Sequence, residues 1–387
     1  MKKRIYLDYA ATSPMLAEAR EAMVPWLDCS FGNPSSIYAE GREAKHAIDT
    51  ARDAVSSALG CRFGEVTFTS GGTESANAAM IGVALANKNA QRDTVLMSAA
   101  EHHCVLETAS VLTRLGLQVK TIPVTAKSVV EPSAVESALT DRTLIVSVMH
   151  ANNETGALND ARAIADLARA SGALYHCDAV QTFPWFNGSA CKAEEIGADL
   201  ISISAHKMGG PKGIGALYVR AGTDTKSVIV GGGQERDSRA GTENVPGIVG
   251  FGAAVDASVK TGCQSVAKKA ARSKFLEELQ RLSPIEFEQI AAGVETLAGH
   301  AHLRFPGVRA ETLLIRLDRD GVAASSGSAC SSGGLNPSHV MLACGLTREQ
   351  AAECVRFTFS GGTTTDAAAT AGAIVAKALT EILSKRA

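Results

Sequence analysis

Six short runs of β-branched and aliphatic residues alternate with stretches of helical periodicity between about residues 64 and 220. The predicted strands cover residues 65–69, 94–98, 143–148, 173–177, 199–203 and 215–219. Strands joined by a helix pair in parallel, because the helix carries the chain back across the face of the sheet. The alternation therefore predicts an α/β fold with a mostly parallel sheet that is covered by helices.

The length of 387 residues exceeds what one compact core normally holds, so we expect two domains or one large domain with a smaller companion. The pattern changes after Gly247, where an alanine- and charge-rich helical stretch from about residue 249 to 281 precedes strand-like pieces such as 312–317. This change predicts a smaller C-terminal domain. Hydrophobic residues make up 45% of the chain and charged residues 20%, which is the balance of an ordinary globular protein.

The charge pattern argues against nucleic acid and membranes as partners. The formal net charge is −2, and no run of Lys or Arg is long enough to follow a phosphate backbone. The N-terminal residues Met1-Lys2-Lys3-Arg4 are basic, but Ile5-Tyr6-Leu7-Asp8 interrupts any apolar stretch at once, and no later segment approaches about 18 uninterrupted apolar residues. We therefore expect a soluble, cytoplasmic protein.

Nine cysteines are scattered along the chain without a CxxC pair. An odd number of scattered thiols in a chain of this length indicates a reducing compartment rather than a disulfide framework. The spacing does not support a structural zinc site, and no metal is expected. Most of these thiols are expected to be small core residues.

Polar residues follow the predicted strands closely. Ligands of open α/β sheets bind beyond the carboxyl ends of the strands, so side chains at these positions are the first candidates for a functional site. The candidates that come just after a strand are Gly71-Gly72-Thr73, Glu101-His102, Asn152-Asn153, Asp178 and Lys207.

Lys207 and Asp178 form the pair with the clearest chemistry. Lys207 lies in a glycine-rich turn in which Ser204 and His206 can bind phosphate beside a positioned amine. Asp178 follows an apolar strand, where a carboxylate is unfavourable unless it is paired. A lysine that closes a Schiff base and a carboxylate that keeps a ring nitrogen protonated indicate a pyridoxal phosphate site, with Gln181 in reach of the ring oxygen. An ordinary exposed lysine and a helix-capping aspartate are the alternatives.

A phosphate site and a proton carrier are predicted after two other strands. The backbone N–H of Gly72 and the hydroxyl of Thr73 open a helical pattern and can hold a phosphate at the positive helix end. A strand-to-helix turn capped by Thr73 explains the same sequence. His102 follows the strand that ends at Ser98, where an imidazole can lie over a flat cofactor and shuttle protons. A surface or core histidine is the alternative there.

Cys330 lies among serines and glycines from Ser325 to Gly334, a composition with too few apolar side chains to pack a loop. We predict a mobile loop over about residues 325–336 that carries a nucleophilic thiol, held partly as thiolate by a nearby base or positive charge. A thiol beside a pyridoxal phosphate site points to sulfur chemistry on an amino acid. Arg356, on an apolar strand, can clamp a substrate carboxylate, and a structural ion pair is the alternative.

These residues, in this order, resemble the cysteine desulfurases of the NifS/IscS type, within the class-V aminotransferase family of fold-type I pyridoxal phosphate enzymes. The resemblance extends almost from end to end of the chain. The segments that carry it are residues 6–12 (YLDYAAT), 32–36 (GNPSS), 69–75 (TSGGTES), 101–102 (EH), 150–156 (HANNETG), 204–213 (SAHKMGGPKG), 231–236 (GGGQER), 239–242 (RAGT) and the Cys330 loop with 337–339 (PSH).

The resemblance implies a large domain over residues 15–258, built on a mostly parallel seven-stranded sheet. It implies a small α+β domain formed by residues 1–14 and 259–387, which carries the cysteine loop. Members of the family are homodimers in which one subunit completes the phosphate site of the other. We therefore expect a homodimer.

The resemblance also implies roles for single residues. Lys207 closes the Schiff base, Asp178 pairs with the ring nitrogen, His102 stacks on the ring and transfers protons, and Cys330 is the nucleophile. The residues implied to contact the cofactor are Lys207, Asp178, Gln181, His102, Gly72, Thr73, Asn153, Ser204, His206 and, across the dimer, Thr242. The residues implied to hold the substrate carboxylate are Asn33, Asn153 and Arg356.

The implied reaction converts L-cysteine to L-alanine and leaves a persulfide on Cys330 for transfer to a sulfur acceptor. Two departures from the family stand out. Residues 360–364 lack the arginine usually found there, so some local charge pairing is expected to be lost, and the chain ends at Ala387 without the longer tail of housekeeping members. Docking to an iron–sulfur scaffold and a dedicated sulfur-donor role therefore both stay open.

Other functions are compatible with part of the pattern. A related pyridoxal phosphate enzyme, such as an aminotransferase or a selenocysteine lyase, would share Lys207 and Asp178. The Cys330 loop argues against the aminotransferase but not against selenocysteine as a substrate. A non-catalytic assembly protein is the rival from another class, and the presence of every candidate catalytic residue argues against it.

Overall fold

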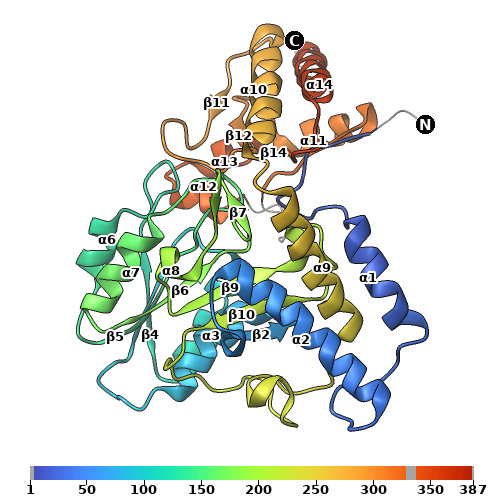
Figure 1. Cartoon of the computed structure of the whole chain (residues 1–387). Helices are drawn as coiled ribbons and strands as arrows, with labels where there is room; N and C mark the ends of the chain where they lie inside the picture. Colours follow the sequence, from blue (N-terminus) through green and yellow to red (C-terminus); the bar gives the residue numbers. More distant parts are fainter. Residues whose placement is uncertain (1–3, 328–336, 386–387) are drawn as a thin grey trace.

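A seven-stranded sheet forms the centre of the computed structural model, which describes residues 4–327 and 337–385 (Figure 1). In spatial order its strands are β2 (Val66–Thr69), β10 (Gly215–Val219), β9 (Leu200–Ser204), β6 (Leu174–Asp178), β5 (Thr143–Ser147), β3 (Thr94–Ser98) and β4 (Gln118–Ile122). Strand β10 runs antiparallel to both of its neighbours, and the other neighbouring pairs are parallel. The prediction of an α/β fold with a mostly parallel seven-stranded sheet is confirmed.

The six strands predicted from apolar runs are all present, and each end agrees within one residue. The seventh strand, β4, has no such run. It lies at the edge of the sheet, and three of its five residues are exposed. An edge strand with one solvated face carries little hydrophobic signal, which is why the sequence alone did not reveal it.

Helices cover both faces of this sheet (Figure 1). On one face, α2 (Ala39–Leu59), α7 (Ala161–Ala170) and α9 (Val245–Thr261) pack against alternate strand residues such as Leu96 and Val146. On the other face, the residues between them, such as Val95 and Ile145, pack against the helices α3 (Gly72–Ala86) and α5 (Thr108–Arg114). Because both faces are buried, the central strands are rich in apolar residues on both sides, and buried polar side chains within them, such as His176 with Ser147 and Ser202, are hydrogen-bonded to one another.

A second core lies around a smaller antiparallel sheet of β11 (Glu288–Gln289), β12 (His300–Arg304) and β14 (Cys354–Thr358). The helices packed there are α10 (Ser265–Leu282), α11 (Ala310–Asp320) and α14 (Thr365–Ser384). Near the N-terminus, β1 (Ile5–Tyr6) pairs in parallel with β13 (Val322–Ala323), so the first residues join this C-terminal part. The remaining elements are α1 (Ala17–Asp28), α4 (His103–Leu106), α6 (Pro132–Ala138), β7 (Trp185–Phe186), β8 (Ser189–Ala190), α8 (Ala193–Ile196), α12 (His339–Ala343) and α13 (Arg348–Ala351).

Two sequence predictions concern this smaller core, a strand at residues 312–317 and a domain boundary after residue 258. The strand predicted at residues 312–317 is wrong, because these residues lie in α11, where Leu313 and Leu317 share a buried helical face. The proposed boundary after residue 258 falls inside α9, which ends at Thr261. The division into residues 15–258 and 1–14 with 259–387 stays a prediction, and the end of α9 is the natural place to refine it.

Helix α14 is long and apolar enough, by length and composition, to cross a membrane. In this fold one side of it, including Val375 and Leu379, is buried in the smaller core, beside α10 (Figure 1). A helix that packs in a protein core can have the same length and apolarity as a membrane-spanning helix.

A buried ion pair fixes an unusual turn below the large sheet. Arg52, on α2, donates two 2.7 Å hydrogen bonds to the Glu235 carboxylate, and both side chains are almost fully buried. The same carboxylate accepts the Phe68 backbone N–H at 2.8 Å. Glu235 and the next two residues have positive φ values of 47°, 56° and 64°, which side-chain-bearing residues rarely adopt. The ion pair therefore stabilises a backbone conformation that would otherwise be unfavourable.

We expect Arg52→Met to lower the free energy of unfolding by about 3–5 kcal/mol, because the substitution leaves the Glu235 carboxylate buried without its charge partner. Urea unfolding measures this change. Lys45→Met is the control: Lys45 pairs with Asp49 on the exposed side of the same helix, and its loss is expected to change the free energy by less than about 0.5 kcal/mol. Equal effects of the two substitutions would show that the buried pair does not stabilise the turn.

Candidate active site

A cavity of about 300 Å³ lies at the carboxyl ends of the central strands. It collects side chains that are far apart in the sequence. The predicted site residues that line it are Gly72, Thr73, His102, Asn153, Asp178, Gln181, Ser204, His206, Lys207 and Arg356. The strand-end positions thus meet in one place, as expected for an open α/β sheet.

Lys207 is held at the wall of this cavity by the N-terminal segment. It ends a short 3₁₀ turn after β9. Its Nζ donates hydrogen bonds to the carbonyl oxygens of Ala10 at 2.7 Å and Ala11 at 2.9 Å. Ser13 in turn donates from its hydroxyl to the Lys207 carbonyl at 2.7 Å. These contacts fix both the backbone and the amine, so the nucleophile is positioned before any ligand arrives.

Asp178 ends β6 and is only 8% exposed. Burial raises the pKa of its carboxyl group to about 6, although the Val180 backbone N–H, donated to Oδ1 at 2.9 Å, and the charge of Lys207 both lower it. The carboxyl group is therefore largely ionised near pH 7 in a poorly solvated place. A cationic N–H would be a favourable partner for it. Gln181, one turn further on, donates from Nε2 to the Ala10 carbonyl at 3.0 Å.

His102 stands at the start of α4 with a defined tautomer. Its Nδ1 accepts a hydrogen bond from the Cys104 backbone N–H at 3.1 Å, so in the neutral ring the proton is on Nε2. Burial, followed by the charge of Lys207, lowers the pKa of His102 to about 4. The imidazole is therefore neutral at physiological pH. A neutral ring can lie against a flat ligand without adding charge to the cavity.

The start of α3 forms a cradle for an anion. The first backbone N–H groups of a helix have no partner within it and carry partial positive charge. A side chain at Gly72 would fill this space, because its Cβ would come within 2.9 Å of the Val180 side chain. Ser204 and His206 lie on the same cavity, and burial together with Lys207 and Lys212 lowers the pKa of His206 to about 4. Hydrogen bonds from neutral donors are thus available to a phosphate there.

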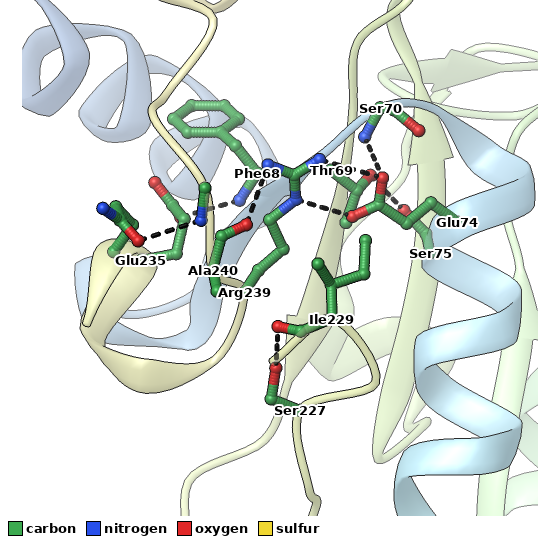
Figure 2. A network of polar contacts seen from close by, with 12 residues as sticks. Phe68, Thr69, Ser70, Glu74, Ser75, Ser227, Ile229, Glu235, Arg239 and Ala240 are labelled. Atoms are coloured by element: carbon green, nitrogen blue, oxygen red, sulfur yellow. Dashed lines mark hydrogen bonds and ion pairs between the residues drawn. The ribbon is translucent and has the colours of Figure 1, made fainter. Parts of the chain in front are cut away.

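An ion pair ties this cradle to the segment that contains residue 242 (Figure 2). Arg239 donates from Nε to Glu74 Oε1 at 2.9 Å, and the other carboxylate oxygen accepts the Ser70 backbone N–H at 2.8 Å. Glu74 lies in the first turn of α3, so the pair links the helix start directly to the stretch before Thr242. No role was assigned to Glu74 or Arg239 from the sequence. An acidic residue in the first turn of a helix was the signal that could have drawn attention to Glu74.

Arg356 forms an ion pair and also lines the cavity. It is 2% exposed, donates to Asp8 Oδ1 at 2.8 Å and to the Asn153 carbonyl at 2.8 Å, and lines the cavity. Its Nε has no partner among residues 4–327 and 337–385. The structural ion pair considered from the sequence is therefore present, and the same guanidinium group lies on the wall of the cavity.

Two predicted residues do not line this cavity, and a third lies outside the described residues. Asn33 is exposed, and its side-chain oxygen accepts the Ser35 backbone N–H at 2.9 Å. Thr242 is also exposed within the single chain. Cys330 lies outside the described residues, as does most of the predicted mobile loop. Among the described residues that line the cavity, Gly327 is the nearest to Cys330 in the sequence.

Two buried carboxyl groups received no role in the sequence analysis, although Glu101 was among its strand-end candidates. Glu154 is 2% exposed and accepts a 2.6 Å hydrogen bond from Ser338, while a Cβ on Gly327 would come within 2.8 Å of the same oxygen. Burial raises the pKa of Glu154 to about 7, although Ser338 and Arg356 lower it. Glu101, fully buried, accepts the Met149 backbone N–H at 2.6 Å, and burial and the nearby Asp178 raise its pKa to about 8.

A lysine amine facing a buried carboxylate across the carboxyl edge of a mostly parallel sheet is the arrangement of the fold-type I pyridoxal phosphate enzymes, and this is the class that the fold and site define. The family model described as aminotransferase class-V matches residues 5–367. The chain belongs to that family, whose members depend on pyridoxal phosphate.

Individual relatives place it in the NifS/IscS-like part of the family. The cysteine desulfurase IscS of Dictyoglomus turgidum is 41% identical over 366 residues, which cover 94% of this chain and 91% of the relative. A solved NifS-like protein matches with a TM-score of 0.89 at 32% identity, covering 98% of this chain and 99% of that one. SspA in complex with cysteine matches with a TM-score of 0.80 at 31% identity, covering 92% of this chain and 98% of that one.

We expect Glu154→Gln to gain stability relative to the wild type as the pH rises from about 4.5 to about 7. In that window the folded wild type keeps a proton that the unfolded chain has lost, so its free energy of unfolding falls with pH, while an amide has no proton to lose. The expected relative gain is about 1–3 kcal/mol between pH 5 and pH 8, measured by urea unfolding. Glu136→Gln, on an exposed face of α6, is the control. A pH-independent difference between Glu154→Gln and the wild type would contradict the assigned proton.

Proposed function

We propose that this protein is a cysteine desulfurase, which uses pyridoxal phosphate to convert L-cysteine to L-alanine and passes the sulfur to an acceptor. The observation that carries the proposal is the meeting of the Lys207 amine, the buried Asp178 carboxyl group and the anion cradle at Gly72 around one cavity. The relatives named above support the choice of substrate, because they include cysteine desulfurases and a protein solved in complex with cysteine.

The residues present fit the cofactor. The open start of α3 at Gly72 and Thr73 suits its phosphate, Asp178 suits its ring nitrogen, and Lys207 suits its aldehyde. Bound pyridoxal phosphate supplies a carbonyl group for amines and an electron-accepting ring. Gln181 would supply a hydrogen-bond donor for the ring oxygen, and the neutral imidazole of His102 would supply a flat neighbour for the ring face.

The chain's own side chains account for the remaining steps. Arg356 and Asn153 orient the substrate carboxylate, while Lys207 and the Nε2 of His102 hold and return protons. The Cys330 thiolate attacks the substrate sulfur, a new S–S bond forms, and the C–S bond breaks with its electron pair moving towards carbon. A proton then completes alanine. The persulfide left on Cys330 must be handed on, so a sulfur-acceptor protein, such as an iron–sulfur scaffold, is part of the proposal. The expected cytoplasmic location stays a prediction.

Cys330→Ala is expected to release neither sulfide nor alanine from L-cysteine, whereas the wild type with a reductant releases both in equal amounts. The expected loss is at least about 10²-fold, because the thiolate is the covalent nucleophile. Visible absorption of the bound cofactor should be unchanged in the variant.

The matched control is Cys29→Ala. This variant removes an exposed thiol that is far from Cys330 in the sequence, and it should keep wild-type rates. If Cys330→Ala still releases both products, the thiol is not the sulfur carrier, and a lyase that needs no persulfide replaces the desulfurase. If the wild type releases neither product while it holds the cofactor, the substrate assignment fails.

The proposal includes a homodimer in which Thr242 of the partner subunit completes the phosphate site. Within one chain Thr242 is exposed and away from the cavity. Large apolar side chains are exposed nearby in sequence and elsewhere, with Phe31 at 83%, Ile37 at 90% and Val230 at 82%. Exposed apolar side chains of this size favour burial against a second copy.

A mixed dimer tests this sharing. We expect a dimer of one Lys207→Ala chain and one Thr242→Asp chain to keep about half of the wild-type activity, because one of its two sites then receives both native residues. The control dimer carries both substitutions in one chain and none in the other, and it should be inactive. The reverse result, with the control half active and the first dimer inactive, would show that Thr242 acts within its own chain.

A further inference from the structure

A second cavity of about 110 Å³ lies behind the catalytic lysine, and no step proposed above uses it. It shares Ala10, Gln181 and Lys207 with the active-site cavity. Its other walls include residues of β7 and residues at the start of α10, which are far apart in the sequence. The residues of this second wall that matter chemically are Cys263, Ser265, Lys268 and His300.

Cys263 is a half-buried thiol surrounded by hydrogen-bond donors. Its sulfur accepts the Gly188 backbone N–H at 3.1 Å, and the residue directly precedes the N-cap of the 18-residue helix α10. Burial alone would raise the pKa of the thiol, but hydrogen bonds with Ser265 and Gly188 and the charge of Lys268 outweigh it and hold the pKa below its ordinary value. A helix start, N–H donors and an ammonium group are the surroundings that create a reactive thiolate.

Two other groups on this wall are ready to receive an anion. Burial lowers the pKa of the Lys268 ammonium group, and the only opposing influence is Cys263, which raises it. His300 is 8% exposed, and its Nε2 has no hydrogen-bond partner within the described parts of the chain. A buried imidazole nitrogen without a partner is unfavourable, and a ligand oxygen or nitrogen in the cavity would satisfy it.

We propose that Cys263 is a second reactive thiolate, separate from Cys330, where a small disulfide that carries a carboxylate forms a mixed disulfide. The Cys263 sulfur attacks one sulfur of the disulfide, the S–S bond breaks, and the other half leaves as a thiolate with the electron pair. The disulfide supplies the oxidising equivalent, so no further reactant is needed. Lys268 pairs with the carboxylate of the half that stays attached to Cys263. The Nε2 of His300 forms a hydrogen bond with a polar atom of the same half. The inference is independent of the desulfurase reaction.

The discriminating experiment compares two reagents of similar size, dithiodiglycolate and bis(2-hydroxyethyl) disulfide, on the cofactor-loaded chain at pH 7 and low salt. Mass spectrometry of the peptide that contains Cys263 gives the rate of modification. We expect the anionic reagent to react about tenfold faster, because a buried positive group concentrates anions at the thiolate. Cys263→Ser should abolish the added mass at this peptide.

Lys268→Met is expected to remove the preference for the anionic reagent. Lys269→Met, which removes the exposed neighbouring charge, should keep it. Circular dichroism checks that both variants are folded. Equal rates for the two reagents in the wild type, or a preference that survives Lys268→Met, would overturn the site. No modification of Cys263 by either reagent would overturn the reactive thiolate itself.

Discussion

The burial of the Asp178 carboxyl group is the constraint on which the site depends. A carboxylate that is 8% exposed at the end of an apolar strand raises the free energy of the fold unless positive charge or hydrogen bonds compensate it. Within the chain it receives one backbone N–H from Val180 and the field of Lys207. The position is therefore suited to a cationic ligand nitrogen, and the neutral imidazole of His102 adds no positive charge beside it.

The first residues of the chain hold the two cores to this site. The Ala10 carbonyl accepts hydrogen bonds from both Lys207 and Gln181, which follow strands β9 and β6 of the large sheet. A few residues earlier, Asp8 pairs with Arg356 of the smaller sheet, and β1 pairs with β13. One short segment thus connects the nucleophile to the predicted carboxylate clamp. A displacement of this segment would disturb both groups together, which couples substrate orientation to the position of the amine.

Sequence reasoning located residues that lie at or just after the end of a buried strand. The strands β3, β6 and β9, which lead to His102, Asp178 and Lys207, are short runs rich in aliphatic residues, so their ends, and the cavity residues found there, could be located from the sequence. The same logic missed β4, a half-solvated edge strand, and misassigned Thr312–Leu317, where β-branched and aliphatic residues occupy a helix face.

Contacts between distant segments could not be predicted from the sequence. The pairs Glu74–Arg239 and Glu154–Ser338 each join residues more than 150 positions apart. The missing arginine among residues 360–364 has no explanation in the structure. A Cβ at Gly361 would come within 1.9 Å of the side-chain oxygen of Gln264, the residue before α10, but that exposed side chain can move aside. For the cysteine loop the sequence is the only source, because its role was inferred from composition and Cys330 lies outside the described residues.

The most direct test of the central claim is the turnover of L-cysteine by Asp178→Asn loaded with pyridoxal phosphate. An amide keeps the shape of the side chain but cannot hold a cationic ring nitrogen in this buried place. The account predicts that alanine formation falls at least about 10²-fold while Lys207 still binds the cofactor, as seen in its visible absorption. Turnover close to the wild-type rate in this variant would contradict the claim that the buried carboxylate controls the chemistry.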